Sequence, residues 1–306
     1  MTEEAKLTVA CDDGFHGQSS VDLGQSLVTH GVARLGPLAI ACDGEINGQL
    51  WGAGATFAQW LMDDSEAGGK SLVSGDAFVD VVELGSGTGL VGLSAAVAGA
   101  GTVVMTDLAL GVDRLREAIV SNTEALEEAG ATVELITAEA LPWGSMEAVE
   151  EVAPAGCDVL IGTDLCYNVD LFDDLLRTIH AIASKKEGCR TLVATEQRWD
   201  DVNARWMSSL ANSKMRCVRE WPLPTSSRLP RPVLCAELVV CEEDAGGDAG
   251  GNDAGEDGGE EDAGNGDGDG DGDGDGEDGD GDGGDVVAAV AGAAALVSGA
   301  NTNANG

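Results

Sequence analysis

The segment best suited to hold a small molecule is a glycine-rich turn between a strand-like run and a helix-like run. Residues 79–84 are mostly apolar and β-branched, and Gly85, Gly87 and Gly89 follow at alternate positions. Glycines let the backbone turn tightly and approach a ligand, and the helix behind them offers unpaired N–H groups. Residues 87–92 satisfy the dinucleotide-binding pattern, so the glycines alone are compatible with several nucleoside cofactors.

Two acidic residues narrow the choice among these nucleoside cofactors. A carboxylate at Glu83 would repel the pyrophosphate of a nicotinamide cofactor but attract the ammonium and sulfonium groups of S-adenosylmethionine. Asp107 ends the next strand-like run, where it can accept both hydroxyls of a ribose of either cofactor, or cap a helix. We therefore predict that Glu83, Gly85, Gly87, Gly89 and Asp107 bind S-adenosylmethionine. A nicotinamide-dependent oxidoreductase and a purely structural turn are the alternatives.

Three further residues follow the later strand-like runs. Trp143 lies in the loop after the third run, where its indole would cover an adenine ring or pack in the core. Asp164 and Tyr167 come at the end of the fourth run, at the sheet edge where open α/β folds bind ligands. Because a carboxylate and a phenol can accept the N–H bonds of an amine, these two are the candidate catalytic residues. Alternatively, Asp164 caps the next helix and Tyr167 packs.

The elements that position these residues alternate between strand and helix, which is typical of βαβ units around a parallel sheet. Right-handed crossovers would place helices on both faces, in three αβα layers. The last two strands have no helix between them, so we expect an antiparallel hairpin at the sheet edge. Predicted strands cover 79–84, 103–106, 132–136, 158–162, 191–195, 215–221 and 232–241, and predicted helices cover 56–62, 90–98, 111–129, 171–184 and 201–209.

Composition divides the chain into three parts. Residues 1–50 form an N-terminal extension with a predicted β-hairpin turning at Asp43 and Gly44, and residues 51–241 form the α/β domain. Residues 242–306 contain 20 of the 55 acidic residues and no Lys or Arg, so we predict an acidic, Gly/Asp-rich disordered tail. The remaining 35 acidic and 16 basic residues disfavour nucleic acid and membranes and would attract a basic protein partner, with solubility alone as the alternative role of the charge.

Eight cysteines and three histidines show no metal-binding spacing, so we predict no metal site. Cysteines in apolar runs are typical of reduced thiols, and the acidic N-terminus lacks the pattern of a targeting segment. The longest apolar run, residues 286–297, is shorter than the roughly 20 residues of a membrane span. We predict a monomer in the cytoplasm, with the nucleus as the alternative compartment.

Taken in order, these segments resemble the family-16 methyltransferases, a class I family that includes many non-histone protein lysine methyltransferases. The resemblance covers about residues 36–240. It is carried by GQLWGAG around Trp51, ELGSGTGLVGL, the Thr106-Asp107 pair, Asn122, LPWG, the quartet from Asp164 to Tyr167, and Glu196 to Arg198. It implies a Rossmann-like class I methyltransferase fold, with a mostly parallel seven-stranded sheet and a C-terminal antiparallel hairpin.

The resemblance also implies roles for individual residues. Asp164 and Tyr167 would face the substrate amine, and Glu83 would organise the glycine turn. The implied reaction is methyl transfer from S-adenosylmethionine to a protein lysine, through positioning and desolvation, without a metal. A protein that keeps the fold only as a binding scaffold is the non-enzymatic alternative. The implied cofactor residues are Trp51, Gly85, Ser86, Gly87, Asp107, Trp143 and Thr163.

Overall fold

The described part of the chain is built around a seven-stranded sheet and a smaller three-stranded sheet. The computed structural model describes residues 8–10, 30–75, 77–224 and 231–241, and the predicted tail lies outside them. The strands are β1 (Thr8–Ala10), β2 (His30–Leu35), β3 (Leu38–Asp43), β4 (Asp80–Leu84), β5 (Thr102–Asp107), β6 (Ile136–Ala140), β7 (Val159–Thr163), β8 (Arg190–Glu196), β9 (Met215–Pro222) and β10 (Val233–Val240). The α-helices are α1 (Gly52–Leu61), α2 (Leu90–Ala98), α3 (Ala109–Ser121), α4 (Thr123–Glu128), α5 (Met146–Val152), α6 (Phe172–Ala183) and α7 (Asp200–Ala211). The 3-10 turns are η1 (Ile46–Gly48), η2 (Lys70–Leu72), η3 (Val133–Leu135) and η4 (Val169–Leu171).

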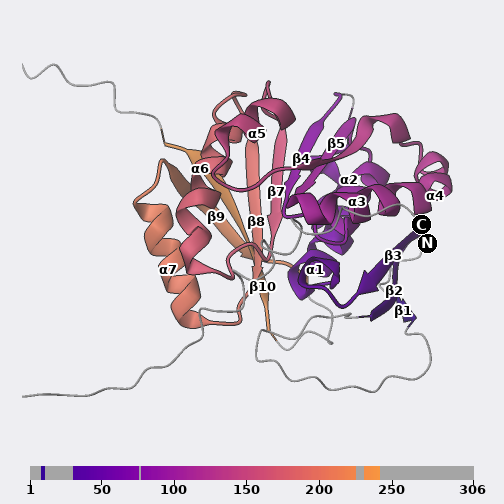
Figure 1. The fold of residues 1–306 in the computed structure, drawn as a ribbon, viewed down its shortest axis with the longest axis horizontal. Coiled ribbons are helices and arrows are strands. Elements are labelled where there is room, and N and C mark those ends of the chain that lie inside the picture. The colour runs from indigo at the N-terminus through magenta and orange to yellow at the C-terminus, as the bar shows by residue number, and fades with distance from the viewer. Residues whose placement is uncertain (1–7, 11–29, 76, 225–230, 242–306) are drawn as a thin grey trace, which may run out of the picture. The chain divides into compact units, whose positions relative to one another are not determined.

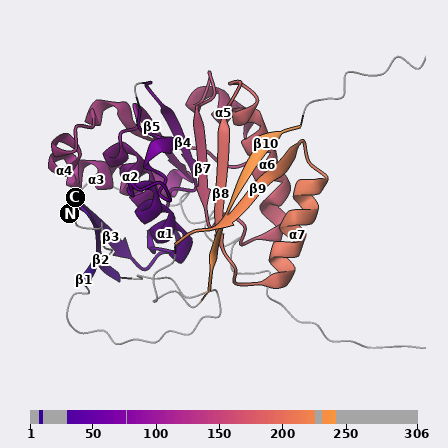
Figure 2. The ribbon, with the colours of Figure 1, turned by 180° about the vertical axis from the view of Figure 1, so that it is seen from behind.

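The large sheet has the strand order β6-β5-β4-β7-β8-β10-β9 (Figures 1 and 2). Its first five strands in this order pair in parallel, whereas β10 is antiparallel to both β8 and β9. The predicted seven-stranded sheet with a C-terminal antiparallel hairpin is therefore confirmed. Because the chain runs outward from β4 to β6 and then crosses to β7, the strand order switches between β4 and β7. Such a switch point leaves a crevice for a ligand at the carboxyl ends of the strands.

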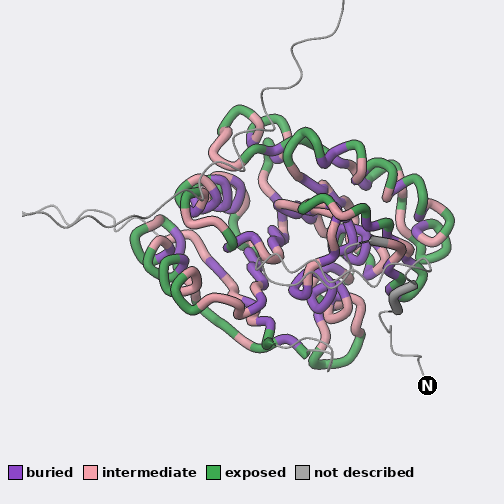
Figure 3. Tube along the Cα trace, turned by 60° about the horizontal axis from the view of Figure 1, so that its bottom comes forward, coloured by how far each residue is buried: buried purple, intermediate pink, exposed green. Residues whose placement is uncertain are grey.

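Helices cover both faces of this sheet. Helices α1, α2 and α3 pack on one face, and α5, α6 and α7 pack on the other. The alternation along β4 shows the two cores, since Val81 packs with the first helix group and Val82 with the second. Figure 3 shows buried residues along the strands and the inner sides of the helices. The predicted three-layer αβα arrangement is confirmed.

The structure corrects the predicted N-terminal hairpin. Strand β3 pairs with the preceding β2, so the tight turn lies between Leu35 and Leu38 and not at Asp43 and Gly44. Residues after Asp43 form η1 instead of a return strand. The side chain of Asn122 fastens β3 to the α/β domain, because its amide accepts from Ala39 N (2.8 Å) and donates to Ala39 O (3.0 Å). Pairing with a strand further upstream was not visible in the local turn signal.

Four other elements differ from the predictions by more than two residues, the first being α1, which begins at Gly52 and not at residue 56. The predicted helix over 111–129 is interrupted at Asn122, whose side chain is occupied by its bonds to β3 and to Ala118 O. Strand β6 begins at Ile136, where it first pairs with β5, and the preceding residues form η3. Helix α5 was missed because it has only seven residues; its signal was Ser145, whose hydroxyl accepts from Ala148 N and caps the helix.

Candidate functional site

The glycine turn joins β4 to α2 and is held by the end of β5. Gly85 and Gly87 have φ values of +60° and +52°, in the left-handed region that glycine adopts without strain. Ser86 N donates to Thr106 O (2.8 Å), and Thr106 N donates back to Ser86 Oγ (3.0 Å). Thr106 Oγ1 also donates to the carbonyl oxygen of Glu83 (2.7 Å). These bonds fix the turn at the carboxyl ends of two parallel strands.

The Glu83 carboxyl group lies beneath the turn and not in front of it. Its side chain is 1% exposed, and Gly92 N in the first turn of α2 donates to Glu83 Oε2 at 2.9 Å. Burial raises the pKa of Glu83 to about 8, although hydrogen bonds from Ser86 and Gly92 oppose the rise. The group is therefore mostly protonated at neutral pH.

Glu83 was expected to select the cofactor by its negative charge, and its burial corrects that explanation. A largely neutral carboxyl group does not choose a sulfonium over a diphosphate by charge. Glu83 acts on the backbone instead: its carboxyl group accepts from the Gly92 amide and ties the end of β4 to the first turn of α2. The expectation that it organises the glycine turn agrees with these contacts.

Asp107 holds the same turn from the end of β5. Its Oδ2 accepts from Gly87 N and its Oδ1 accepts from Leu108 N, each at 2.7 Å. Burial raises the pKa of Asp107, and the amides of Gly87 and Leu108 oppose the rise. Asp107 does not cap α3, whose N-cap is Leu108. Because a carboxylate oxygen accepts more than one hydrogen bond, both oxygens can still accept from ribose hydroxyls.

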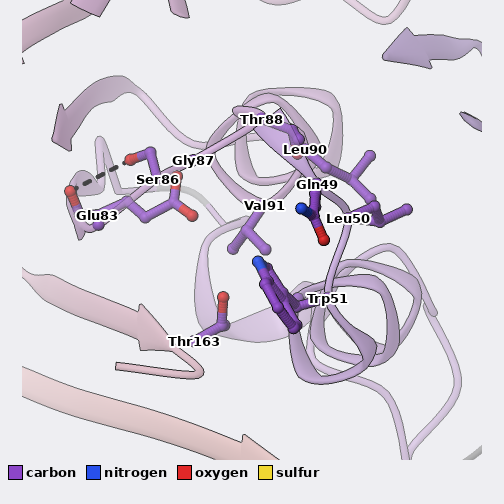
Figure 4. Close-up of a pocket in the computed structure, with 12 residues that line it drawn as sticks. Gln49, Leu50, Trp51, Glu83, Ser86, Gly87, Thr88, Leu90, Val91 and Thr163 are labelled. Atoms are coloured by element: carbon purple, nitrogen blue, oxygen red, sulfur yellow. Dashed lines mark hydrogen bonds between the residues drawn. The ribbon is translucent and has the colours of Figure 1, made fainter. Parts of the chain in front are cut away.

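A pocket lies between the glycine turn and the start of α1 (Figure 4). In Figure 4 the side chains of Trp51, Val91 and Thr163 point toward the same space. The predicted residues that line it are Trp51, Glu83, Gly85, Ser86, Gly87 and Thr163. The lining residues that the sequence did not predict are Gln49, Leu50, Gly54, Thr88, Leu90 and Val91.

Gly54 shows which signal could have found the missed residues. A Cβ at Gly54 would lie 3.3 Å from Thr163 Oγ1, so a small residue is needed where α1 crosses the end of β7. The run of Gly and Ala over residues 52–55 is the sequence feature that permits this approach. Thr88 and Val91 belong to the glycine turn and the start of α2, so they follow from the motif itself.

Three predicted cofactor residues, Gly89, Asp107 and Trp143, do not line this pocket. Gly89 faces the protein, because a Cβ there would lie 3.2 Å from Leu115 and 3.4 Å from Met105. Its contacts are those of helix packing. Trp143 approaches the turn from the other side, since a Cβ at Gly85 would lie 3.4 Å from its ring. Trp143 is partly buried and packs against the core under α5–α7, as the core-packing alternative expected.

Asp164 follows β7 directly and lies in a buried ion cluster. Its Oδ2 accepts from Arg198 Nη2 (2.7 Å) and from Ala53 N (3.2 Å), and its Oδ1 accepts from Glu196 N (3.1 Å). Arg198 Nη2 also donates to Glu196 Oε2 at 3.0 Å. The side chains of Asp164, Glu196 and Arg198 are 7%, 3% and 5% exposed. Burial raises the pKa of Asp164, and the Arg198 guanidinium opposes the rise.

These contacts differ from the free carboxylate that was expected to receive a substrate amine. Asp164 also does not cap η4 or α6, whose N-caps are Asn168 and Leu171. It joins the start of α1 to the end of β8, and its φ of +54° is the only left-handed value of a non-glycine among the described residues. The guanidinium of Arg198 lies 5.1 Å from the centre of the Trp51 ring, a cation–π contact that supports the pocket wall.

Tyr167 is the candidate catalytic residue that remains open to solvent. The residue is 48% exposed, so it does not pack in the core. Its ring centre lies 6.5 Å from that of Trp143. Partial burial and then the Asp107 carboxylate raise the pKa of Tyr167, so the phenol keeps its proton at neutral pH. A protonated phenol near Asp107 can both donate to and accept from a polar ligand.

The described residues contain no group of three or more His, Cys, Asp or Glu side chains arranged to hold a metal ion. A search of the same residues finds no helix with the length and apolar character needed to cross a bilayer.

The strand order, the glycine turn after β4 and the acid at the end of β5 together define a class I methyltransferase fold. A family model described as lysine methyltransferase matches residues 39–213, and the chain belongs to this family, the family-16 methyltransferases. The resemblance found in the sequence is therefore confirmed.

Individual relatives agree with the family match. The chain is 33% identical over 135 residues to mouse (Mus musculus) protein N-lysine methyltransferase METTL21A, which is 44% of this chain and 55% of that protein. It is 34% identical over 99 residues to mouse EEF1A lysine methyltransferase 3, covering 32% and 38% of the two chains. The match thus spans about half the length of these curated relatives or less. A solved structure, magnesium protoporphyrin IX methyltransferase from Synechocystis PCC 6803 with bound S-adenosylmethionine, is 17% identical with a TM-score of 0.40, covering 62% of this chain and 78% of that one.

Proposed function

We propose that the protein transfers a methyl group from S-adenosylmethionine to the ε-amine of a lysine in a protein substrate. The observation that carries the proposal is the pocket at the glycine turn, which the Asp107 carboxylate holds from the end of β5. A carboxylate at this position can accept the ribose hydroxyls of a nucleoside cofactor bound at the glycine turn. Membership of the lysine methyltransferase family and the similarity to a protein N-lysine methyltransferase support lysine as the acceptor.

The residues at the pocket fit such a cofactor. Gly85 and Gly87 would let the backbone approach it, and Asp107 would accept its ribose hydroxyls beside the bonds from Gly87 and Leu108. Trp51 and Thr163 would form the wall toward β7. When bound, S-adenosylmethionine supplies an electrophilic methyl group on a positively charged sulfur. The protein's part is to hold the acceptor in line with that methyl and to exclude water.

The acceptor side is supported by Tyr167, an exposed phenol three residues after Asp164 of the buried ion cluster. Lysine reacts as a neutral amine, so it must lose a proton to water before or during transfer. The Tyr167 oxygen can accept an amine N–H bond and thereby orient the nitrogen lone pair. In that cluster Asp164 and Glu196 share the Arg198 guanidinium, which also contacts the Trp51 ring of the pocket wall. The acidic composition also supports a basic protein as partner, in preference to nucleic acid.

A titration separates this proposal from the oxidoreductase alternative. Isothermal calorimetry with S-adenosylhomocysteine should show binding in the micromolar range, and NADH at the same concentrations should give no heat. The second step is incubation with isotopically labelled S-adenosylmethionine and a cell lysate, followed by mass spectrometry of the labelled site. Binding of NADH alone would favour the oxidoreductase. Cofactor binding without label on any protein would favour the scaffold.

A further inference from the structure

We infer that the entrance of the site is a docking surface for a substrate segment in which apolar residues neighbour the target lysine and further basic residues flank them. The inference rests on the proposed function and names the substrate chemistry. Four large apolar side chains are exposed around the entrance: Ile46 (58%), Leu108 (58%), Leu110 (80%) and Tyr167 (48%). We call these four residues the apolar rim. Apolar side chains that are grouped and exposed are typical of interaction sites.

Contacts on three elements place the rim around one entrance. Leu108 directly follows Asp107, and Leu110 lies in the first turn of α3. Asn47, next to Ile46, approaches the same turn, since a Cβ at Gly111 would lie 3.0 Å from the Asn47 side-chain amide. The carbonyl of Asn47 also covers the glycine turn, at 3.2 Å from a Cβ built on Gly87. The η1 turn therefore lies against both the glycine turn and the start of α3.

Tyr167 completes the rim from the side of β7. The Asp107 carboxylate contributes to the rise of the Tyr167 pKa, and Trp143 connects Tyr167 to Gly85 through ring and backbone contacts. These contacts place the rim residues next to the residues to which the cofactor and the amine are assigned. A lysine that reached Tyr167 would bring its neighbouring side chains onto Ile46, Leu108 and Leu110.

Three exposed acids lie near members of the rim. Glu45 precedes Ile46, and Asp170 lies three residues after Tyr167. Glu139 pairs with Thr106 in the sheet register and so lies beside the end of β5. The nearby cations of α3 are engaged, because Arg114 pairs with Asp43 and Arg116 with Asp113.

Charge complementarity therefore selects a segment with further Lys or Arg outside the apolar contacts. The same acids disfavour a nucleic acid, whose phosphates they would repel. The occupant is a protein segment that combines a central lysine, apolar neighbours and basic flanks.

The test uses the full chain and compares two exposed apolar residues of helix α3. Leu110→Ser removes a member of the rim, and Val120→Ser removes a side chain of similar exposure (74%) at the other end of α3. Each variant is incubated with labelled S-adenosylmethionine and a lysate of undermethylated cells of the source organism, and the initial rate of methyl incorporation into protein lysine is measured. Affinity for S-adenosylhomocysteine and the melting temperature are recorded for each protein.

We expect Leu110→Ser to lower incorporation about tenfold, because burying one leucine in an interface contributes roughly that factor. Its cofactor affinity and melting temperature should match those of Val120→Ser, which keeps the full rate. Equal rates for the two variants would overturn the inference. A wild-type protein that labels no lysine at all would instead refute the proposed function, so the two failures are distinguishable.

A second pair of variants tests the charges. Glu45→Gln with Asp170→Asn removes two charges at the entrance, and Glu124→Gln with Glu128→Gln removes two exposed charges on α4. The first pair should lower incorporation several-fold at low salt, with a smaller difference at high salt because salt screens exposed charges. The α4 pair should retain the wild-type rate. An equal fall in incorporation for both pairs would mean that the rate depends on the total charge of the protein and not on the acids at the entrance.

Discussion

The two halves of the site stabilise buried acids by different means. In the half formed by β4 and β5, Glu83 and Asp107 accept hydrogen bonds from backbone amides of the glycine turn and of the elements that follow the two strands. In the half formed by β7 and β8, Asp164 and Glu196 share the Arg198 guanidinium. Amides only partly offset desolvation, so the Glu83 pKa rises to about 8. Burial raises the Asp164 pKa as well, but there the first group to oppose the rise is the Arg198 guanidinium, a full positive charge.

This difference separates the tasks of the two halves. Backbone amides belong to the turn itself, so the first half fixes the shape of the cofactor pocket without needing a fixed charge. The second half depends on one side chain that also contacts Trp51 and, through Asp164, the start of α1. Loss of Arg198 should therefore disturb the protein more than loss of any single acid in the first half.

The largest effect is expected for Arg198→Ala. The variant leaves two buried carboxylates without a cation, and breaking a buried ion pair in this way typically costs about 3–5 kcal/mol of the free energy of unfolding. Urea denaturation measures the loss. The control is Arg177→Ala, which removes a side chain that is 66% exposed and pairs with Asp174 on the surface, worth at most about 1 kcal/mol. Similar small losses for both variants would show that the buried cluster is not needed for stability.

Asp107→Ala should weaken cofactor binding by about tenfold to a hundredfold, because hydrogen bonds to a charged group contribute about 1.5–3 kcal/mol. Calorimetric titration with S-adenosylhomocysteine measures the change. Asp113→Ala is the matched control, since its carboxylate is 88% exposed and lies on α3 outside the pocket. Unchanged affinity in Asp107→Ala would place the ribose elsewhere.

Glu83→Gln should change how stability depends on pH. The folded pKa of about 8 lies above the ordinary value of 4.5, so the folded protein binds this proton more tightly than the unfolded chain does. The wild-type contribution is therefore complete at low pH and is lost as pH rises toward 8, by at most about 1.4 kcal/mol per pH unit. Glutamine does not titrate, so the variant lacks this slope. Parallel stability curves between about pH 5 and 8 would mean that Glu83 is ionised throughout.

The smallest effect is expected for Tyr167→Phe. The variant keeps the ring and removes the hydroxyl, so turnover should fall about fivefold, the loss of one hydrogen bond of about 1 kcal/mol, while cofactor affinity stays unchanged. Single-turnover methylation and the titration above measure the two quantities. A loss of cofactor affinity equal to that of Asp107→Ala would contradict the division between a cofactor half and an acceptor half.

Many of the helices and strands could be predicted from the sequence because they depend on the local pattern of apolar residues and glycines. The helix over 90–98 follows from the glycine turn and the apolar run behind it, and the hairpin of β9 and β10 follows from the lack of a helix between two strand-like runs. The errors occurred where a distant partner decided the outcome. Strand β3 turned toward β2, and the helix after β5 ended at Asn122 because that side chain binds Ala39.

The sequence by itself determined the type of fold, the glycine turn and the order of acids along the strand ends, because periodicity and spacing are properties of the chain. Only the tertiary structure decided what each acid does. Glu83 and Asp164 both end buried strands in the sequence, yet one meets the Gly92 amide and the other meets Arg198, 34 residues further along the chain. Charge state and hydrogen-bond partners depend on burial and on which groups the fold brings within a few ångströms, and no local pattern contains that information.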